Sequence, residues 1–347
     1  MKSTITYFRL PMVATVIGLI AIAYVGFATT GSPAGILKFI LVGSVLILLE
    51  ISLSFDNAVV NANKLKLMTP IWQRRFLTWG ILIAVFGMRI VFPIAIVAVA
   101  AGIGPLDATI LAATQPAKYA DIMDDAHVSI AAFGGTYLMM VALSFFIDAD
   151  KKIDWIRIVE TKLRSCADLR AIEVVFVLCV ILGFTLAQPA GHESDFLFAS
   201  VLGLLAFLLV EILGHVLDKG QTSAAIATGG LGAFLYLEVL DASFSFDGVI
   251  GAFALTNNMF LIAIGLGVGA FYVRSITIML VDRETLSQLL FLEHGAFYSV
   301  FVLAVIMLLQ SIFSVPEYVV GLLSISLIAL ATLSSIRHAK RNARGAK

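Results

Sequence analysis

Long apolar stretches alternate with short polar segments along almost the whole chain. Ten of these stretches approach or exceed the roughly 20 mostly apolar residues that a membrane-spanning helix needs. They cover residues 12–30, 36–60, 76–102, 129–148, 172–189, 197–217, 225–255, 258–281, 296–314 and 317–336. The pattern predicts an all-α polytopic membrane protein, a single membrane domain over residues 1–347 with about ten transmembrane helices. The first stretch has no convincing cleavage site after it, so we expect a retained helix.

Composition agrees with this pattern and excludes other classes. Of the 347 residues, 13% are charged and 60% are hydrophobic, with a mean hydropathy of +1.02. Soluble domains have roughly 25% charged and 45–50% apolar residues. The 23 basic and 23 acidic residues balance, so no net positive charge favours nucleic acid. Cys166 and Cys179 do not have the spacing of a metal motif, and we expect two unpaired thiols.

The basic residues predict the orientation of the helices. With the N-terminus placed in the cytoplasm, 19 of the 23 Lys and Arg fall in inner segments, and Lys38 and Lys118 fall in outer ones. Arg89 and Arg274 lie within apolar stretches. Cytoplasmic segments are enriched in Lys and Arg, so we expect a multi-pass protein of the cell (inner) membrane with both termini in the cytoplasm. Residues 149–171 are predicted to be a cytoplasmic linker with an amphipathic helix on the membrane lipid.

A short acidic motif occurs twice. Residues 50–57 read EISLSFDN and residues 241–248 read DASFSFDG, so both copies follow the pattern acid-x-Ser-x-Ser-Phe-Asp. The next apolar stretch carries one Arg each time. We therefore predict a first repeat half over 31–148 and a second over 197–314. Five crossings separate the two motifs, which makes the repeat inverted, and inverted repeats of transporters place their site near the membrane midplane.

The motif side chains indicate a site for a hard cation. A charged side chain at the centre of a membrane costs at least about 2.5–3.5 kcal/mol, so such residues usually have a function. Carboxylates, hydroxyls and an amide are oxygen donors that suit Mg²⁺, Ca²⁺ or Mn²⁺. The candidate metal ligands are Glu50, Ser54, Asp56, Asn57, Asp241, Ser245 and Asp247. Arg89 and Arg274 are expected to balance charge, and Asn61, Glu211 and Glu238 to support the site from further out.

Helix geometry complicates a site built from both acids of one motif. Six positions at 100° each place Glu50 and Asp56 about 240° apart around an unbroken helix. Either the helix unwinds near 54–57, or the two acids make different contacts. Gly248 and Gly251 favour a break in the second copy. Pro93 cannot donate to the carbonyl of Arg89, so a kink is expected there.

The two motifs together resemble those of the TerC family of bacterial membrane proteins, over roughly residues 40–310. The chain is most similar to TerC relatives known only as a domain of unknown function. It differs from typical members at Ser245, Gly248 and Gly251, where they carry Ala, Ser and Pro. The resemblance implies export of Mn²⁺ or a related divalent cation, an association with tellurite resistance and a distant relation to LysE-type exporters. It also implies that Glu50, Asp56, Asn57, Asp241 and Asp247 are ligands.

The leading hypothesis from the sequence is a divalent cation exporter, with Mn²⁺ favoured, driven by proton entry. No G-x-x-x-x-G-K-[ST] motif is present that would bind ATP. We expect no enzymatic activity, no resident cofactor and no nucleic-acid partner. One alternative is an accessory membrane protein that acts through protein partners in tellurite or metal stress or in metal loading. A lesser one is an intramembrane aspartyl protease using Asp56 and Asp247, although Phe246 stands where that family has glycine.

Overall fold

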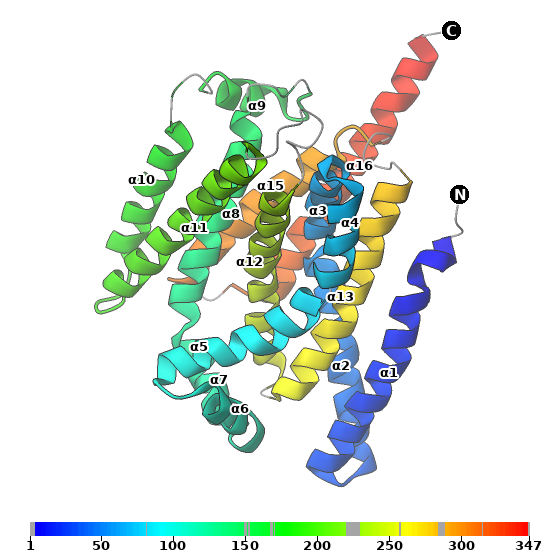
Figure 1. Ribbon diagram of the computed structural model, residues 1–347, viewed down its shortest axis with the longest axis vertical. Coiled ribbons are helices and arrows are strands. Elements are labelled where there is room, and N and C mark those ends of the chain that lie inside the picture. The colour runs from blue at the N-terminus through cyan, green and yellow to red at the C-terminus, as the bar shows by residue number, and fades with distance from the viewer. Residues whose placement is uncertain are drawn as a thin grey trace. The chain divides into compact units, whose positions relative to one another are not determined.

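The fold is seen in a computed structural model (Figure 1) that describes residues 4–80, 82–148, 151, 153–166, 169, 171–219, 230–256, 258–283, 289–313 and 315–345. All regular elements in these residues are helices, as the hydropathy pattern predicted. The chain divides into two compact units. The first comprises residues 1–54, 70–127 and 241–279, and the second comprises 55–69, 128–240 and 280–347. Each unit therefore draws segments from both predicted repeat halves.

Eight helices among the described residues are long and apolar enough to cross a membrane. They are Thr4–Thr30, Pro33–Leu53, Pro70–Val99, His127–Ile147, Glu193–Ile212, Met259–Asp282, Leu292–Gln310 and Val319–Arg341. Two of the ten predicted stretches have no counterpart in this set. The stretch 172–189 contains a helix of only 16 residues, and the helix Leu231–Leu255 within 225–255 carries three acids. The described part of the chain thus has the make-up of a polytopic membrane protein with eight such helices, and the predicted number of ten is not confirmed.

The first unit holds the N-terminal hairpin and the segment around Arg89. Its elements are α1 (Thr4–Thr30), α2 (Pro33–Leu53), α4 (Pro70–Arg75), the π-helices η1 (Phe76–Gly80) and η2 (Ile83–Val91), α5 (Phe92–Ala101), α6 (Pro105–Thr114), α7 (Pro116–Asp125) and α13 (Met259–Asp282), whose last residues belong to the second unit. The acidic segment between α5 and α8 is taken up largely by α6 and α7. Helix α12 (Leu231–Leu255) contributes its residues from Asp241 onward.

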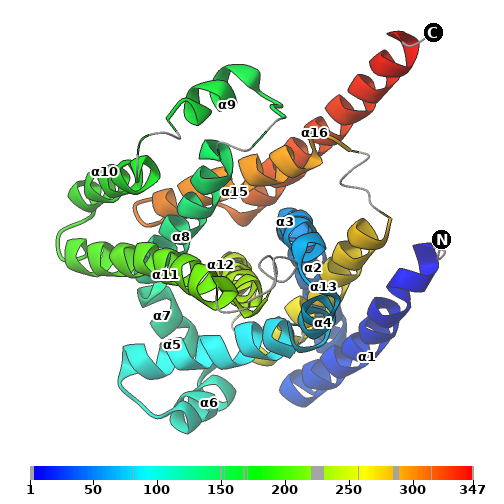
Figure 2. The same cartoon turned by 45° about the horizontal axis from the view of Figure 1, so that its top comes forward.

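The turn between α1 and α2 follows from its sequence. Gly31 adopts a left-handed backbone (φ 62°), and its amide donates to the carbonyl of Phe27 at 2.8 Å. The Ser32 hydroxyl then accepts from the amide of Gly35 at 3.1 Å, and Pro33 begins α2. Gly after a helix end, Ser at the N-cap and Pro at the first position are the preferred residues for this geometry. The two helices consequently run side by side, as both ribbon views show (Figures 1 and 2).

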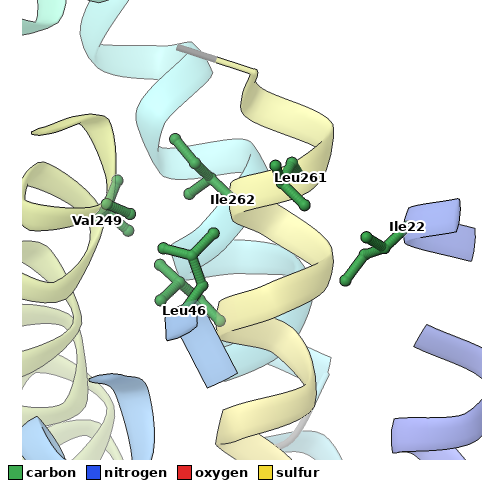
Figure 3. Packing of buried hydrophobic residues seen from close by; sticks show 7 residues of the cluster. Ile22, Leu46, Val249, Leu261 and Ile262 are labelled. Carbon is green, nitrogen blue, oxygen red and sulfur yellow. The ribbon is translucent and has the colours of Figure 1, made fainter. Parts of the chain in front are cut away.

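Small residues let the helices of the first unit approach closely. Its apolar core joins Ile22 of α1, Leu46 of α2, Val249 of α12, and Leu261 and Ile262 of α13 (Figure 3). These helices meet where glycines leave space for a neighbouring side chain. Close packing at small residues is how helices associate in lipid, where no hydrophobic force acts between them.

The second unit is built around α15 (Leu292–Gln310). Helix α15 packs against α3 (Phe55–Leu67) and α16 (Glu317–Gly345). A side chain at Gly295 would collide with Ala331 of α16, so this glycine is required for the α15–α16 contact. The remaining elements are α8 (His127–Ile147, whose first residue belongs to the first unit), α9 (Arg157–Arg164), α10 (Ile172–Ala187), α11 (Glu193–Lys219) and the first part of α12. The predicted amphipathic linker, residues 149–171, contains α9, which covers only part of this segment.

Candidate functional site

The helix that carries the first motif is interrupted inside the motif. Helix α2 ends at Leu53, Ser54 caps it with a non-helical backbone (φ −98°, ψ 14°), and α3 begins at Phe55. The sequence left open whether the helix is interrupted near residues 54–57, and the structure shows that it is. Glu50 and Asp56 lie on different helices, so the 240° separation of an unbroken helix does not apply to them.

Glu50 forms a buried ion pair with Arg89 in the first unit. The Glu50 and Arg89 side chains are 2% and 4% exposed, and Arg89 Nη2 bonds Glu50 Oε1. The Ser54 hydroxyl donates to the same oxygen at 3.0 Å. A buried carboxylate requires such a charged partner and hydrogen bonds to offset its loss of hydration. Arg89 therefore balances the charge of Glu50.

The backbone around Arg89 is irregular. Arg89 lies in the π-helix η2, and the amide of Phe92 donates to the carbonyl of Gly87, five residues earlier. Pro93 follows at the start of α5. The change from π-helix to α-helix thus falls between Val91 and Phe92, next to the proline, which has no amide hydrogen to donate. Such π-helical turns occur frequently at functional sites.

Two glycines pack against the Glu50 side chain. A Cβ atom at Gly269 of α13 would lie 2.5 Å from the Glu50 Cβ and 3.0 Å from the Ile47 carbonyl oxygen. A Cβ atom at Gly248, in the second motif, would lie 3.3 Å from Glu50 Oε2. The backbone of the second motif therefore lies next to the acid of the first motif. Any larger residue at 269 would displace the Glu50 side chain.

Asp56 is wholly buried in the second unit. Its Oδ1 accepts from the amide of Asn57 at 2.8 Å, and its Oδ2 accepts from the hydroxyl of Ser299 on α15 at 2.8 Å. Asp56 also lies in the first turn of α3, where the helix dipole stabilises a negative charge. Ser299 was not predicted from the sequence, because a single Ser in an apolar helix is common.

Two buried amides accompany Asp56 on α3. Asn57 and Asn61 are 2% and 5% exposed. The amide oxygen of Asn61 accepts no hydrogen bond from the residues that the structure describes. An amide oxygen without such a bond can accept a hydrogen bond from a side chain or a water molecule, or it can bind a cation. Asn61 is thus placed as an additional oxygen donor on the helix of Asp56.

The second motif lies on an uninterrupted helix. Helix α12 continues from Leu231 to Leu255, although Gly248 and Gly251 favoured a break. Asp241 is half-buried on it, and the side chains of Ser245 and Asp247 lie outside the described residues. Arg274 is half-buried on α13. The two copies of the motif therefore share a sequence pattern but differ in backbone structure.

The two outlying acids differ in their surroundings. Glu238 on α12 is buried with 7% exposure, whereas Glu211 on α11 is exposed. Within the described residues, no three His, Cys, Asp or Glu side chains lie close enough together to hold a metal ion. The described candidate ligands therefore stand in separate settings, with Glu50 paired to Arg89 and Asp56 bonded to Ser299.

An unpredicted acid, Glu160, fixes the linker to α15. It is fully buried and accepts from Lys151 Nζ at 2.7 Å and from the amides of Trp155 and Ile156 at 3.1 and 3.0 Å. His294 Nε2 lies 3.3 Å from it. Burial raises the pKa of a carboxyl, but the hydrogen bonds from His294, Lys151 and the Ile156 amide outweigh this effect and lower the pKa of Glu160 to about 2. No sequence signal separates Glu160 from the other charged residues of the linker.

The buried carboxylates, the buried arginine and the apolar helices define a helical membrane protein with ionisable groups inside its packed core. Comparison with known families matches residues 55–342 to the family described as protein of unknown function (DUF475). The match covers most of the chain, so the chain belongs to the DUF475 family. It includes Asp56 and the second motif, and it begins after Glu50 and Ser54. No curated protein and no solved structure matches the chain.

Proposed function

We propose that this protein is a secondary transporter that exports a divalent cation, with Mn²⁺ as the first candidate, in exchange for protons. Asp56 carries the proposal. Its carboxylate is 0% exposed in a chain built from apolar helices, within a motif that occurs twice. Ionisable groups are costly inside a membrane protein and typically lie on ion or proton pathways.

The proposal assigns different tasks to the two acids of the first motif. Arg89 and Ser54 hold Glu50, so its charge is already balanced. Asp56 accepts hydrogen bonds from the backbone amide of Asn57 and from the hydroxyl of Ser299, and this hydroxyl can rotate when an ion binds. Oxygen donors of this kind suit Mn²⁺, Mg²⁺ and Ca²⁺. In this proposal Asp56 and Asn57 bind the cation and exchange it for protons, and Glu50 with Arg89 fixes the helices of the first unit. Asp247, a ligand expected from the sequence, is tested separately.

The repeated motif supports the same assignment. In an inverted repeat, the second motif would run through the membrane in the opposite direction, with both termini in the cytoplasm as the basic residues predict. Within the first unit, the proximity of Gly248 to Glu50 supports a functional relation between the second motif and the acid that opens the first. The resemblance to TerC proteins favours Mn²⁺ among the hard cations. An accessory role in metal or tellurite stress remains the competing proposal.

The test is ion flux in proteoliposomes that contain the purified full-length protein, a divalent-sensitive dye and a pH dye. Mn²⁺, Ca²⁺, Mg²⁺ and Zn²⁺ are supplied in turn under an imposed pH gradient. We expect flux of Mn²⁺ with opposite proton movement, and its loss in Asp56→Asn and Asp247→Asn. Asp107→Asn, the same change at an exposed acid of α6, is the matched control and should keep full flux.

Absence of flux under every gradient would overturn the proposal and favour the accessory role. Flux that is unchanged in both Asp56→Asn and Asp247→Asn would retain transport but refute the assigned site. Cleavage of membrane substrates that is lost in Asp56→Ala would instead identify a protease.

A further inference from the structure

A cavity of about 410 Å³ lies within the second unit, next to the α3–α15 contact. Its polar lining comes from α3, the end of α8, α12 and α15, and includes Asn63, Lys64, Asp148, Tyr236, Glu293 and His294. This volume falls in the range of sites that bind small molecules or hydrated ions. The chemistry proposed above does not use this cavity.

The cavity is connected to Asp56 by the pairing of α3 with α15. Asp56 accepts from Ser299, and Asn63 donates its amide to Glu293. The residue numbers increase on α3 as they decrease on α15, so the two helices run antiparallel at this contact. Seven residues of helix correspond to about 10 Å. The cavity therefore lies about two helical turns from Asp56 along one continuous contact.

The cavity holds a lysine beside carboxylates. The Lys64 ammonium lies 5.1 Å from the centre of the Tyr236 ring, and the charges of Glu293, Asp148 and Glu211 act on it. Lys151, the other cavity cation, is already paired with Glu160 at 2.7 Å. Lys64 is thus one of the cations that act on the cavity carboxylate of Glu293, beside Lys151.

His294 offers the cavity a nitrogen lone pair. Its Nε2 lies 2.8 Å from the Ile153 carbonyl oxygen, which requires a hydrogen on Nε2 and leaves Nδ1 as an acceptor. The residue is 4% exposed, and the buried Nδ1 has no hydrogen-bond partner within the described part of the chain. A histidine whose other nitrogen donates to a backbone carbonyl has the arrangement found at metal ligands.

We propose that this cavity is a waiting site for a hydrated divalent cation on its way to Asp56, and that the Lys64 ammonium occupies that position when no ion is there. Glu293 and Asp148 face the ion through its water molecules. Small divalent cations commonly keep several waters in proteins, so three close ligands are not needed. The proposal rests on the transport function proposed above, because it names the route to Asp56.

The experiment measures equilibrium binding of Mn²⁺ to the detergent-solubilised full-length protein by electron paramagnetic resonance. All variants carry Asp56→Asn, so binding at the deeper site does not contribute. Lys64→Met removes the competing ammonium, and we expect Mn²⁺ affinity to rise about tenfold or more, since one nearby unit charge has this effect at protein-like permittivity. Lys64→Arg keeps the charge and should bind Mn²⁺ as weakly as the unchanged lysine does.

Lys66→Met provides the matched control. It removes the same charge from the same helix two residues further on, outside the cavity lining. Its charge acts on Glu293 less than that of Lys64 does, so affinity should change much less than in Lys64→Met. Adding Glu293→Gln to Lys64→Met should abolish the gain. The proposal is overturned if Lys64→Met and Lys66→Met bind Mn²⁺ equally, or if the gain survives Glu293→Gln.

The two proposals fail separately. A Lys64-dependent gain in binding without flux in proteoliposomes would retain the cavity site and refute transport. Flux that needs Asp56, together with unchanged binding in Lys64→Met, would retain transport and refute the cavity site.

Discussion

The ion pair between Arg89 and Glu50 should stabilise the first unit strongly, because both side chains are almost completely buried. Arg89→Met removes the charge and leaves the Glu50 carboxylate without its cation. Removing one partner of a buried pair costs about 3–5 kcal/mol, since the remaining charge has neither water nor a partner. The expected loss is therefore a large fraction of the 5–15 kcal/mol that stabilises a typical protein.

The assay is thermal unfolding of the detergent-solubilised protein. In proteins of 150–250 residues, 1 kcal/mol shifts Tm by about 2–4 °C, and larger chains shift less. With about 2 °C per kcal/mol as the upper value for this longer chain, Arg89→Met should lower Tm by up to about 6–10 °C. The double variant Arg89→Met/Glu50→Gln should recover at least half of the loss, because it leaves no buried charge.

Arg164→Met is the matched control for this prediction. Arg164 pairs with Asp154, but these side chains are 27% and 15% exposed. Partly solvated ion pairs contribute about 0–1 kcal/mol, so Tm should fall by no more than about 2 °C. The reasoning is refuted if Arg89→Met costs no more than Arg164→Met, or if the double variant is less stable than the single one.

Three further perturbations test separate contacts. Gly269→Ala should lower Tm by more than Gly183→Ala does. A Cβ atom at 269 would lie 2.5 Å from Glu50, whereas nothing lies within 4 Å of a Cβ atom at 183. Equal effects would contradict the close packing at Gly269. Ser299→Ala should cost about 1.5–3 kcal/mol in chemical unfolding, the value of a hydrogen bond to a charged group, and a neutral result would exclude the Asp56 contact. Glu160 has a pKa of about 2 in the folded protein and 4.5 ordinarily, so its carboxylate stabilises the linker above pH 4.5 and loses this effect as pH falls towards 2. Pepsin cleavage near Trp155, measured at each pH relative to an unfolded peptide of the same sequence, should rise in that window. Relative cleavage that is equally fast at pH 5 would refute the assignment.

Much of the fold follows from the hydropathy pattern, because an apolar helix in lipid must satisfy its own backbone. The all-helical class was predicted on this basis and is confirmed. Helix ends inside an apolar stretch were not predictable in the same way. The motif 50–57 contains no Gly or Pro, yet α2 ends at Leu53 and α3 begins at Phe55. The end of α2 depends on contacts that hydropathy does not contain, among them the bond from Ser54 to Glu50.

The candidate site was partly accessible from the sequence for a similar reason. Charged residues within apolar stretches are conspicuous, so Glu50, Asp56 and Arg89 could be selected, and the repeat joined them into motifs. Two other residues that make buried polar contacts were not conspicuous. Ser299 is one polar residue in α15, and Glu160 lies among many charges in the linker. Only the packing of distant segments shows that Ser299 donates a hydrogen bond to the buried Asp56 and that Glu160 contacts α15.

The difference between the two motif copies restricts how the protein can work. In the first copy, the interruption at Ser54 separates Glu50 from Asp56, and the two acids bind different partners. In the second copy, Asp241 and Asp247 share the uninterrupted α12, where six positions place them about 240° apart. For the transport that we propose, a symmetric exchange in which each copy performs the same step is therefore disfavoured. We instead expect a change of local structure at the interrupted copy during transport. Transporters commonly use interrupted helices in this manner, because the freed backbone groups lie next to the ion.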